Sequence, residues 1–302
     1  MSAPQVRITD PHATPGSALA TLKSYVELTK PRIIELLLIT TVPAMVVAAG
    51  GWPSTWLVLA TLIGGTLSAG GANAINNVID RDIDQLMRRT RGRPIPTARI
   101  GPRPALAFGA SLGLTGFVWL WLAANLLAAV LSTAGLLFYV FVYTMVLKRS
   151  TPQNIVIGGA AGSVPALVGW AAVNDELSVA AWVMFAIIFF WTPPHFWALA
   201  LRYEDDYAVA RIPMLPVVVG RSRTLEQIEL YTVVLVGVSL LLYPTGAVGW
   251  IYLVAAIALG GWLYRAARRL HRRPGESMRF FGFSNLYLAG LFIMMAVDAL
   301  VL

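Results

Sequence analysis

Residues 104–147 read PALAFGASLGLTGFVWLWLAANLLAAVLSTAGLLFYVFVYTMVL, an almost unbroken apolar stretch that ends at Lys148 and Arg149. A membrane-spanning helix needs about 20 predominantly apolar residues, so this stretch is too long for one span. We place a break at residues 123–125, which read AAN. The stretch therefore predicts two consecutive transmembrane helices.

Further apolar runs flank this stretch on both sides. They begin near Ile33, Trp56, Asn154, Val179, Leu225, Val248 and Phe280. With the starts near Pro104 and Leu126, they predict an all-α polytopic membrane protein of about nine transmembrane helices. Only 13% of the 302 residues are charged, whereas soluble domains have about 25%. Cysteine is absent, which excludes disulfides, thiolate metal sites and a cysteine nucleophile.

The 23 Lys and Arg residues are confined to the N-terminal segment and to alternate loops. The intervening loops, with the sequences GGWPST, AAN, VNDELS and YPTG, contain none. By the positive-inside rule, the N-terminus and the basic loops are expected in the cytoplasm, and the C-terminus outside. The formal net charge of +8 then reflects topology, and nucleic-acid binding is not needed to explain it.

The ends of the chain suggest how the domain is organised. The first 30 residues lack the positive start, apolar core and small-residue cleavage site of a signal peptide. We expect a flexible cytoplasmic tail over residues 1–20 and one transmembrane domain over residues 21–302. An acidic cluster follows the second predicted span, and another follows the sixth. This spacing predicts two four-helix halves, residues 21–147 and 153–267, plus a ninth helix over residues 280–301.

The first acidic segment, residues 73–94, reads NAINNVIDRDIDQLMRRTRGRP. Asn76, Asp80 and Asp84 recur at i, i+4 and i+8 and lie on one face of a helix, whereas Asp82 lies on the opposite face. Two carboxylates one turn apart, with an amide oxygen, suit Mg²⁺, which completes its shell with water and phosphate oxygens. The alternative is a solvated loop whose acids pair with neighbouring arginines. Acids at a membrane helix end favour the functional interpretation.

The second acidic segment, residues 202–216, reads RYEDDYAVARIPMLP. Its acids, Glu204, Asp205 and Asp206, are consecutive, so they cannot share one helix face. We expect one of them to bind a metal ion and another to pair with an arginine. A solvated acidic turn would have the same sequence pattern.

Basic and imidazole groups near these segments have two interpretations each. Lys148 and Arg149 end the fourth predicted span, where they either hold a diphosphate or anchor the membrane topology. His195 lies inside the sixth span, where it either contacts a cofactor or shuttles a proton, or is a hydrogen-bonded bundle histidine. Glu35 and Asp298, near the ends of the first and last spans, have no explanation from the sequence.

These motifs resemble the UbiA superfamily of intramembrane aromatic prenyltransferases, whose N-x-x-x-D-x-x-x-D pattern matches Asn76, Asp80 and Asp84. The heme-farnesylating branch of that superfamily is closer still. Its motifs are DRDIDxxMxRTRxRP over residues 80–94, YTxxLKRxTPQNIVIGG over 143–159, WTPPHFWALA over 191–200 and DYxxAxIPMLPVVxG over 206–220. One position departs from the superfamily: Arg202 stands where a second D-x-x-x-D would begin, and Asp206 matches its last residue.

The resemblance implies a UbiA-type bundle with a central cavity, in a bacterial-type inner membrane. Farnesyl diphosphate would bind through Mg²⁺ at both acidic segments, and the 2-vinyl group of heme B would attack the allylic cation to give heme O. The implied catalytic residues are Asp80, Asp84, Asp206 and Lys148. The implied substrate-binding residues are Asn76, Arg88, Arg91, Arg93, Arg149, Arg202, Tyr203 and His195. The implied metal ligands are Asn76, Asp80, Asp84, Asp205 and Asp206.

Heme O feeds terminal oxidases, directly or through heme A, so heme A synthase or oxidase assembly proteins are expected partners besides membrane lipid. Two alternatives remain open at this point. A related prenyltransferase would act on a quinone precursor or on chlorophyllide. A cation-coupled secondary transporter would use intramembrane acids as ion sites, although the acids of this chain cluster with arginines at helix ends and not at mid-span.

Overall fold

The computed structural model describes residues 18–301, apart from the side chains of residues 32, 33 and 35–38. Every regular element in this part of the chain is a helix. The long helices are α2 (Pro31–Ala49), α3 (Thr55–Ile79), α5 (Pro102–Ala123), α6 (Leu126–Leu137) continued by the π-helix η1 (Phe138–Leu147) and α7 (Lys148–Ser150), α8 (Asn154–Asn174), α9 (Val179–Arg202), α11 (Leu215–Leu240), α12 (Trp250–Arg272) and α13 (Ser277–Val301). The short elements are α1 (Ala18–Thr29), α4 (Arg81–Leu86), α10 (Glu204–Val209), η2 (Tyr243–Thr245) and η3 (Pro274–Glu276).

The prediction of an all-α membrane bundle with about nine spans is confirmed. Among the described residues, 8 helices are long and apolar enough to cross a membrane, and α2 is a further helix whose residues Ile39–Ala49 are apolar. The protein is therefore an integral membrane protein. The first 17 residues of the predicted tail, and the side chain of Glu35, lie outside the described part.

The break at residues 123–125 lies where it was predicted. Asn125 accepts a hydrogen bond from the amide of Ala128 (2.8 Å), which caps the start of α6, and its amide group also donates to the carbonyl of Ala171 (2.6 Å). The seventh long helix begins ten residues before the predicted Leu225, at Leu215. The apolar run before Gly220 is already helical, and Gly220 itself (φ 79°) interrupts the helix.

Glycines allow α3 and α5 to approach each other closely. A Cβ at Gly71 would lie 2.6 Å from the carbonyl oxygen of Gly109, and a Cβ at Gly116 would lie 3.0 Å from the amide nitrogen of Ser68. Small residues at such crossings let backbones pack together without a large apolar driving force, as transmembrane helices require. This contact fixes α3, and therefore the position of the first acidic segment at its end.

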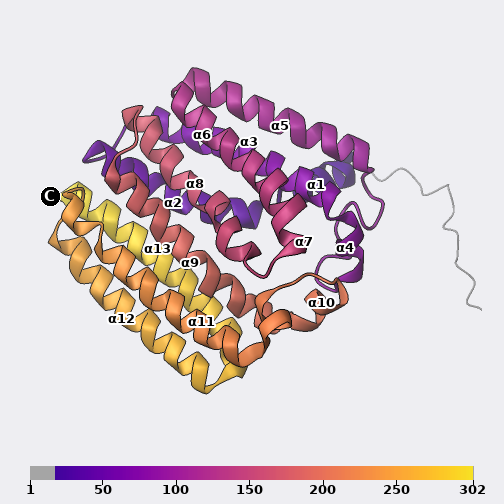
Figure 1. The fold of residues 1–302 in the computed structure, drawn as a ribbon. Coiled ribbons are helices and arrows are strands. Elements are labelled where there is room, and N and C mark those ends of the chain that lie inside the picture. Colours follow the sequence, from indigo (N-terminus) through magenta and orange to yellow (C-terminus); the bar gives the residue numbers. More distant parts are fainter. Residues whose placement is uncertain (1–17, 302) are drawn as a thin grey trace, which may run out of the picture.

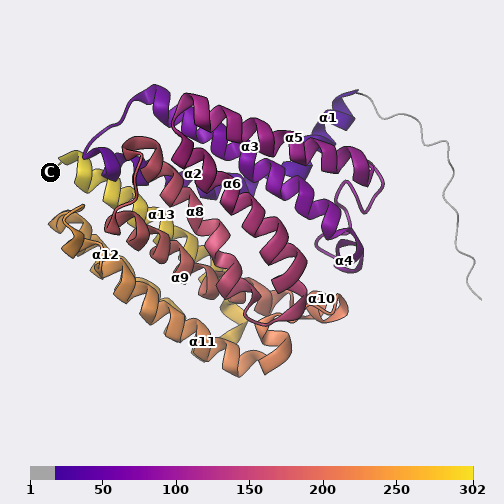
Figure 2. The same ribbon diagram turned by 45° about the horizontal axis from the view of Figure 1, so that its top comes forward.

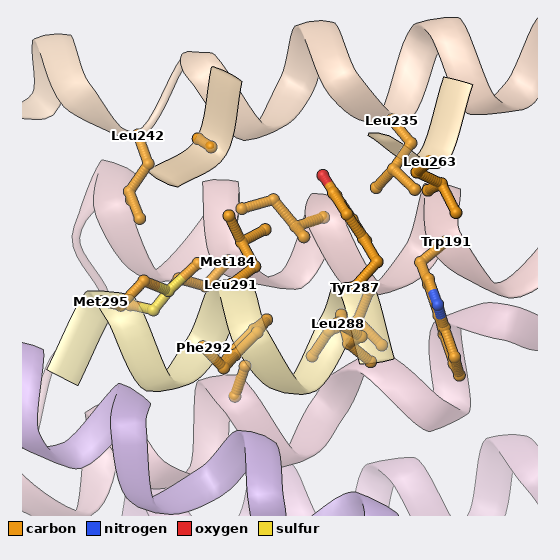
Figure 3. Close-up of a cluster of buried hydrophobic side chains, with 14 of the residues drawn as sticks. Met184, Trp191, Leu235, Leu242, Leu263, Tyr287, Leu288, Leu291, Phe292 and Met295 are labelled. Carbon is orange, nitrogen blue, oxygen red and sulfur yellow. The ribbon is translucent and has the colours of Figure 1, made fainter. Parts of the chain in front are cut away.

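The C-terminal helices enclose the largest apolar core. Figure 3 shows the buried side chains of Met184, Leu235, Tyr287 and Phe292 converging from α9, α11 and α13. Helix α13 packs on α12, α9 and α2, so the last helix of the bundle contacts its first long helix. Asp298, which the sequence left unexplained, is 1% exposed and accepts hydrogen bonds from the backbone amides of Gly249 and Tyr252. It therefore caps the start of α12, because the first amides of a helix have no partner within that helix.

The two ends of the bundle differ in what they carry. Figures 1 and 2 show α4 and α10 at one end, with the C-terminus at the opposite end, and Figure 1 shows α7 on the side of α4 and α10. Both acidic segments and the Lys148–Arg149 pair therefore lie at the same end of the molecule.

Candidate functional site

The two acidic segments contact each other, although more than a hundred residues separate them in the sequence. Arg88 of the first segment donates through Nε to Oδ1 of Asp206 in the second, at 2.8 Å. A small apolar cluster lies beside this ion pair and holds Ile83 and Met87 from the first segment against Tyr207 and Met214 from the second. Side chains of both segments can therefore act on one ligand.

Asp80 is the most enclosed acid of the site, with no exposed surface. Its Oδ2 accepts hydrogen bonds from Lys148 Nζ (2.5 Å) and from the amide group of Asn76 (2.8 Å). Arg149 lies 3.9 Å from its Oδ1. Asn76, Asp80 and Lys148, which the sequence predicted as site residues, are thus brought together.

Asp84 and Asp82 face opposite sides of α4, as their helical spacing predicts. Asp84 is 2% exposed and pairs with Arg93 at 2.7 Å. Asp82 is more than half exposed, and Arg149 binds both of its oxygens at 2.7 Å. These hydrogen bonds from Arg149 lower the pKa of Asp82 to about 2. Arg149 therefore bridges the outer face of α4 and the buried Asp80.

The three acids of the second segment have three different environments. Asp206 is 4% exposed and pairs with Arg88, whereas Glu204 is partly exposed and pairs with Arg221 at 2.9 Å. Asp205 is exposed, as is Arg202. The structure therefore places only Asp206 among the buried acids of the site.

Tyrosine and arginine side chains line the space between the segments. The guanidinium of Arg89 lies 5.8 Å from the ring centre of Tyr203, a cation–π contact, and its charge also acts on Tyr207. Burial raises the pKa of Tyr207. Arg91, a predicted substrate-binding residue, is exposed on the same loop. Arg89 and Tyr207 were not predicted as site residues, because side chains with no regular spacing carry no signal in one sequence.

The π-helix η1 contacts the site through Thr144. Thr144 Oγ1 donates to the carbonyl of Tyr139, five residues earlier, and accepts from the amide group of Asn76 at 3.0 Å. The rings of Tyr139 and Tyr143 stack at 5.5 Å, and a Cβ at Gly158 would lie 2.3 Å from the ring of Tyr143. π-Helical turns are rare and occur often at functional sites. Here the turn directs Thr144 onto Asn76.

Lys30 is a site residue that sequence reasoning missed, since it was counted only as a basic residue of the N-terminal segment. It lies between α1 and α2 in the left-handed backbone region (φ 54°, ψ 63°), and its Nζ donates to Oδ1 of Asn76 at 2.7 Å. Burial, followed by repulsion from Arg93 and Lys148, lowers the pKa of Lys30 well below its usual value. The signal available in the sequence was a lysine placed at a helix break, directly before Pro31.

His195 lies in α9 and is 4% exposed. Its ring is stacked between Trp191 (4.2 Å) and Phe281 (4.1 Å), and its Nδ1 lies 2.8 Å from the hydroxyl of Ser284. That hydroxyl donates its only proton to the carbonyl of Phe281 at 2.8 Å. In this arrangement it accepts from Nδ1–H of His195, and Nε2 then has a free lone pair; in the other tautomer the hydroxyl donates to Nδ1. Within the described residues, no hydrogen bond is made by Nε2.

Comparison with known proteins identifies the family. The sequence pattern of the UbiA prenyltransferase family matches residues 37–290. The chain belongs to the UbiA prenyltransferase family. A relative from Gloeobacter violaceus, named protoheme IX farnesyltransferase, is 55% identical over 286 residues. The match covers 94% of this chain and 94% of the relative. Protoheme IX farnesyltransferase 2 from Saccharopolyspora erythraea is 52% identical over 304 residues, which cover 99% of this chain and 91% of the relative.

Solved structures of other proteins have the same fold. A digeranylgeranylglyceryl phosphate synthase matches with a TM-score of 0.77 at 20% identity, over 93% of this chain and 99% of the other. A UbiA homologue from Archaeoglobus fulgidus, bound to DMAPP and Mg²⁺, matches with a TM-score of 0.64 at 16% identity, over 91% of this chain and 99% of the other. At these identities the likeness establishes the shared fold alone.

The donor groups of this site fit a divalent cation. Oδ1 of Asp80 and Oδ2 of Asp206 are buried and make no hydrogen bond within the described part of the chain. Buried carboxylate oxygens are costly without a partner. Among the described residues, no three His, Asp or Glu side chains already surround one point. The carboxylates of this site are ligands of the type that Mg²⁺ takes, with water and phosphate oxygens completing its shell.

Proposed function

We propose that this chain transfers the farnesyl group of farnesyl diphosphate to the 2-vinyl group of heme B, and that water completes the hydroxyethylfarnesyl group of heme O. The new carbon–carbon bond forms as the allylic carbon–oxygen bond breaks. Diphosphate leaves with the bonding electrons, and the water that adds to the vinyl-derived cation loses one proton to solvent. The family, and the two farnesyltransferase relatives above 50% identity, support this choice of substrates.

One observation carries the proposal: three buried aspartates from two distant segments lie in one polar site, each paired with a cation. Asp80 pairs with Lys148, Asp84 with Arg93 and Asp206 with Arg88. A site with matched acids and bases can receive a metal–diphosphate complex by exchanging partners. The acids turn to the metal ion, and the cations turn to the phosphate oxygens.

Mg²⁺ would be held by Asp80, Asp84 and Asp206, with Asn76 and Asp205 as further oxygen donors. When bound, Mg²⁺ neutralises the charge that develops on the departing diphosphate. Lys148 and Arg93, which lie beside the first two acids, would bind the diphosphate oxygens in this site. Because both side chains are mostly buried, their charges are less screened by water than surface charges are.

Arg88, Arg91, Arg149, Arg202 and Tyr203 are proposed as further contacts to the substrates. Arg88 and Arg149 already bind acids of the site, and Tyr203 lies under Arg89. The exposed Arg91 and Arg202 would attract the diphosphate or the propionates of heme from solution.

His195 is proposed to contact the heme substrate through its iron. A ring nitrogen with a free lone pair can ligate a metal, whereas a hydrogen bond to a propionate would need a proton on that nitrogen. In the tautomer whose Nδ1–H donates to Ser284, Nε2 is free to ligate the iron. We expect the heme spectrum of His195→Ala to differ from that of the wild type. An unchanged spectrum and an unchanged heme affinity would refute the contact.

The orientation in the membrane is also proposed. The basic loops between the spans share the end of the bundle that carries α4 and α10. The positive-inside rule puts this end, with the N-terminus, in the cytoplasm of a bacterial-type inner membrane, and the C-terminus outside.

The experiment that tests the function supplies purified protein with Mg²⁺, labelled farnesyl diphosphate and one acceptor at a time. The acceptors are heme B, 4-hydroxybenzoate and chlorophyllide, and the products are identified by mass spectrometry. Heme O, formed only with heme B, is the expected result. A prenylated product from another acceptor alone would assign the chain to a different branch of the UbiA family.

A further inference from the structure

Lys30 differs from the other cations of the site in the group that it binds. Lys148, Arg93 and Arg88 are each bonded to a carboxylate. Nζ of Lys30 is instead bonded to the neutral amide oxygen of Asn76, at 2.7 Å. Within the described residues, no carboxylate is bonded to this partly buried cation, which is therefore costly to maintain, and a bound anion would remove that cost.

The backbone at Lys30 supports a functional side chain. Its φ of 54° lies in the left-handed region, where glycine and asparagine are favoured and other residues are strained. Strain of this kind often marks a functional site when the surrounding structure maintains it. Here the strained residue directs a lysine from the junction of α1 and α2 onto the first residue of the N-x-x-x-D-x-x-x-D motif.

The hydrogen bond also fixes the orientation of Asn76. Lysine can only donate, so the amide oxygen of Asn76 must face Lys30. The amide nitrogen then faces Asp80 (2.8 Å) and Thr144 (3.0 Å). In this arrangement the oxygen that Asn76 would offer to a metal ion is occupied by Lys30.

We propose that Lys30 couples diphosphate binding to metal binding: its ammonium group leaves Asn76 for a diphosphate oxygen, and the freed amide oxygen becomes available to the metal ion. This inference rests on the proposed function only in requiring a prenyl diphosphate substrate. Metal alone binds weakly, because the ligand oxygen is occupied and a positive charge lies beside it. Diphosphate removes both obstacles together.

Two ligands are measured on purified protein in detergent. Mn²⁺ alone is titrated by electron paramagnetic resonance, and farnesyl thiolodiphosphate, a poorly ionising analogue, is titrated at saturating Mn²⁺. For Lys30→Asn, we expect Mn²⁺ alone to bind about tenfold more tightly, because repulsion between like charges is removed, and the analogue to bind about tenfold more weakly. Opposite changes for the two ligands are the signature of coupling, and simple loss of structure would weaken both.

Three further variants make the test specific. Lys30→Gly should behave like Lys30→Asn, since both suit a left-handed backbone, and Lys30→Arg should retain the coupling because it keeps the charge. Arg211→Asn is the matched control, because Arg211 is also basic and left-handed (φ 54°) but exposed. It should change neither affinity. Unchanged or weaker Mn²⁺ binding in both neutral Lys30 variants would overturn the proposal.

The heme O assay separates this inference from the proposed function. A wild-type protein that shows the coupling but produces no heme O would leave the role of Lys30 standing and remove the assigned acceptor. If the wild type produces heme O while the neutral Lys30 variants bind both ligands normally, the coupling alone is wrong.

Discussion

The two acidic segments hold their carboxylates in different ways. In the first, Asp80 and Asp84 are 0% and 2% exposed, and each is bonded to a mostly buried cation. In the second, Asp206 is 4% exposed, but its partner Arg88 comes from the first segment and is 72% exposed. The first segment is thus fixed by enclosed ion pairs, whereas the second is attached to it through a solvated arginine.

The difference follows from spacing. Acids at i and i+4 share one face of a helix, so Asp80 and Asp84 both point into the bundle. Consecutive acids diverge around the helix, so only one of Glu204, Asp205 and Asp206 is buried. We infer that the first segment is preorganised for the metal–diphosphate complex and that the second completes the site when the complex binds.

The largest expected effect tests the first segment. Asp80→Asn should lower kcat/KM for farnesyl diphosphate by about 1,000-fold, because it removes a charged metal ligand and leaves Lys148 without its acid. Heme O formation followed by mass spectrometry gives the rate. Asp82→Asn is the control on the opposite face of α4, and its exposed ion pair predicts a change of no more than about twofold. Equal losses in the two variants would contradict the assignment of faces.

A smaller effect is expected where the segments meet. Arg88→Ala should raise KM for farnesyl diphosphate about tenfold and change kcat less, because Asp206 keeps its carboxylate but loses the bond that positions it. Steady-state kinetics separates the two constants. Arg221→Ala is the control, because it removes the bond to Glu204, another acid of the second segment. It should leave KM and kcat within about twofold of the wild type. If Arg221→Ala were the more harmful variant, the second segment would bind substrate through Glu204.

The sequence was informative where a physical pattern repeats along the chain. Helix length, the apolar runs and the i, i+4, i+8 spacing predicted the bundle and the face shared by Asn76, Asp80 and Asp84. It was less informative around Gly220, where one residue with φ 79° separates a short helical stretch that begins at Leu215 from the main part of α11. A break made by a single backbone angle leaves the hydrophobic pattern unchanged.

Contacts between distant elements could not be predicted from one sequence. Lys30 reaches Asn76 across 46 residues, and Arg88 reaches Asp206 across 118. Neither pair has a local signal, because the first depends on how the α1–α2 junction meets α3, and the second depends on how the segments that contain α4 and α10 meet. For Lys148, the sequence allowed a diphosphate ligand or a topology anchor, and its bond to Asp80 favours the first.

The smallest effect tests whether burial alone makes an acid of this chain functional. Asp298 is 1% exposed, as enclosed as Asp80, but its oxygens cap the amides of Gly249 and Tyr252 at the end of the bundle away from α4. Asp298→Asn should lower the free energy of unfolding by about 1–2 kcal/mol, because an amide accepts through one oxygen only. Thermal unfolding in detergent gives the stability, and heme O formation per folded molecule should stay within about twofold of the wild type. A large loss of specific activity without a loss of stability would mean that a buried carboxylate far from α4 and α10 takes part in the reaction. The contrast between the two acidic segments would then no longer define the site.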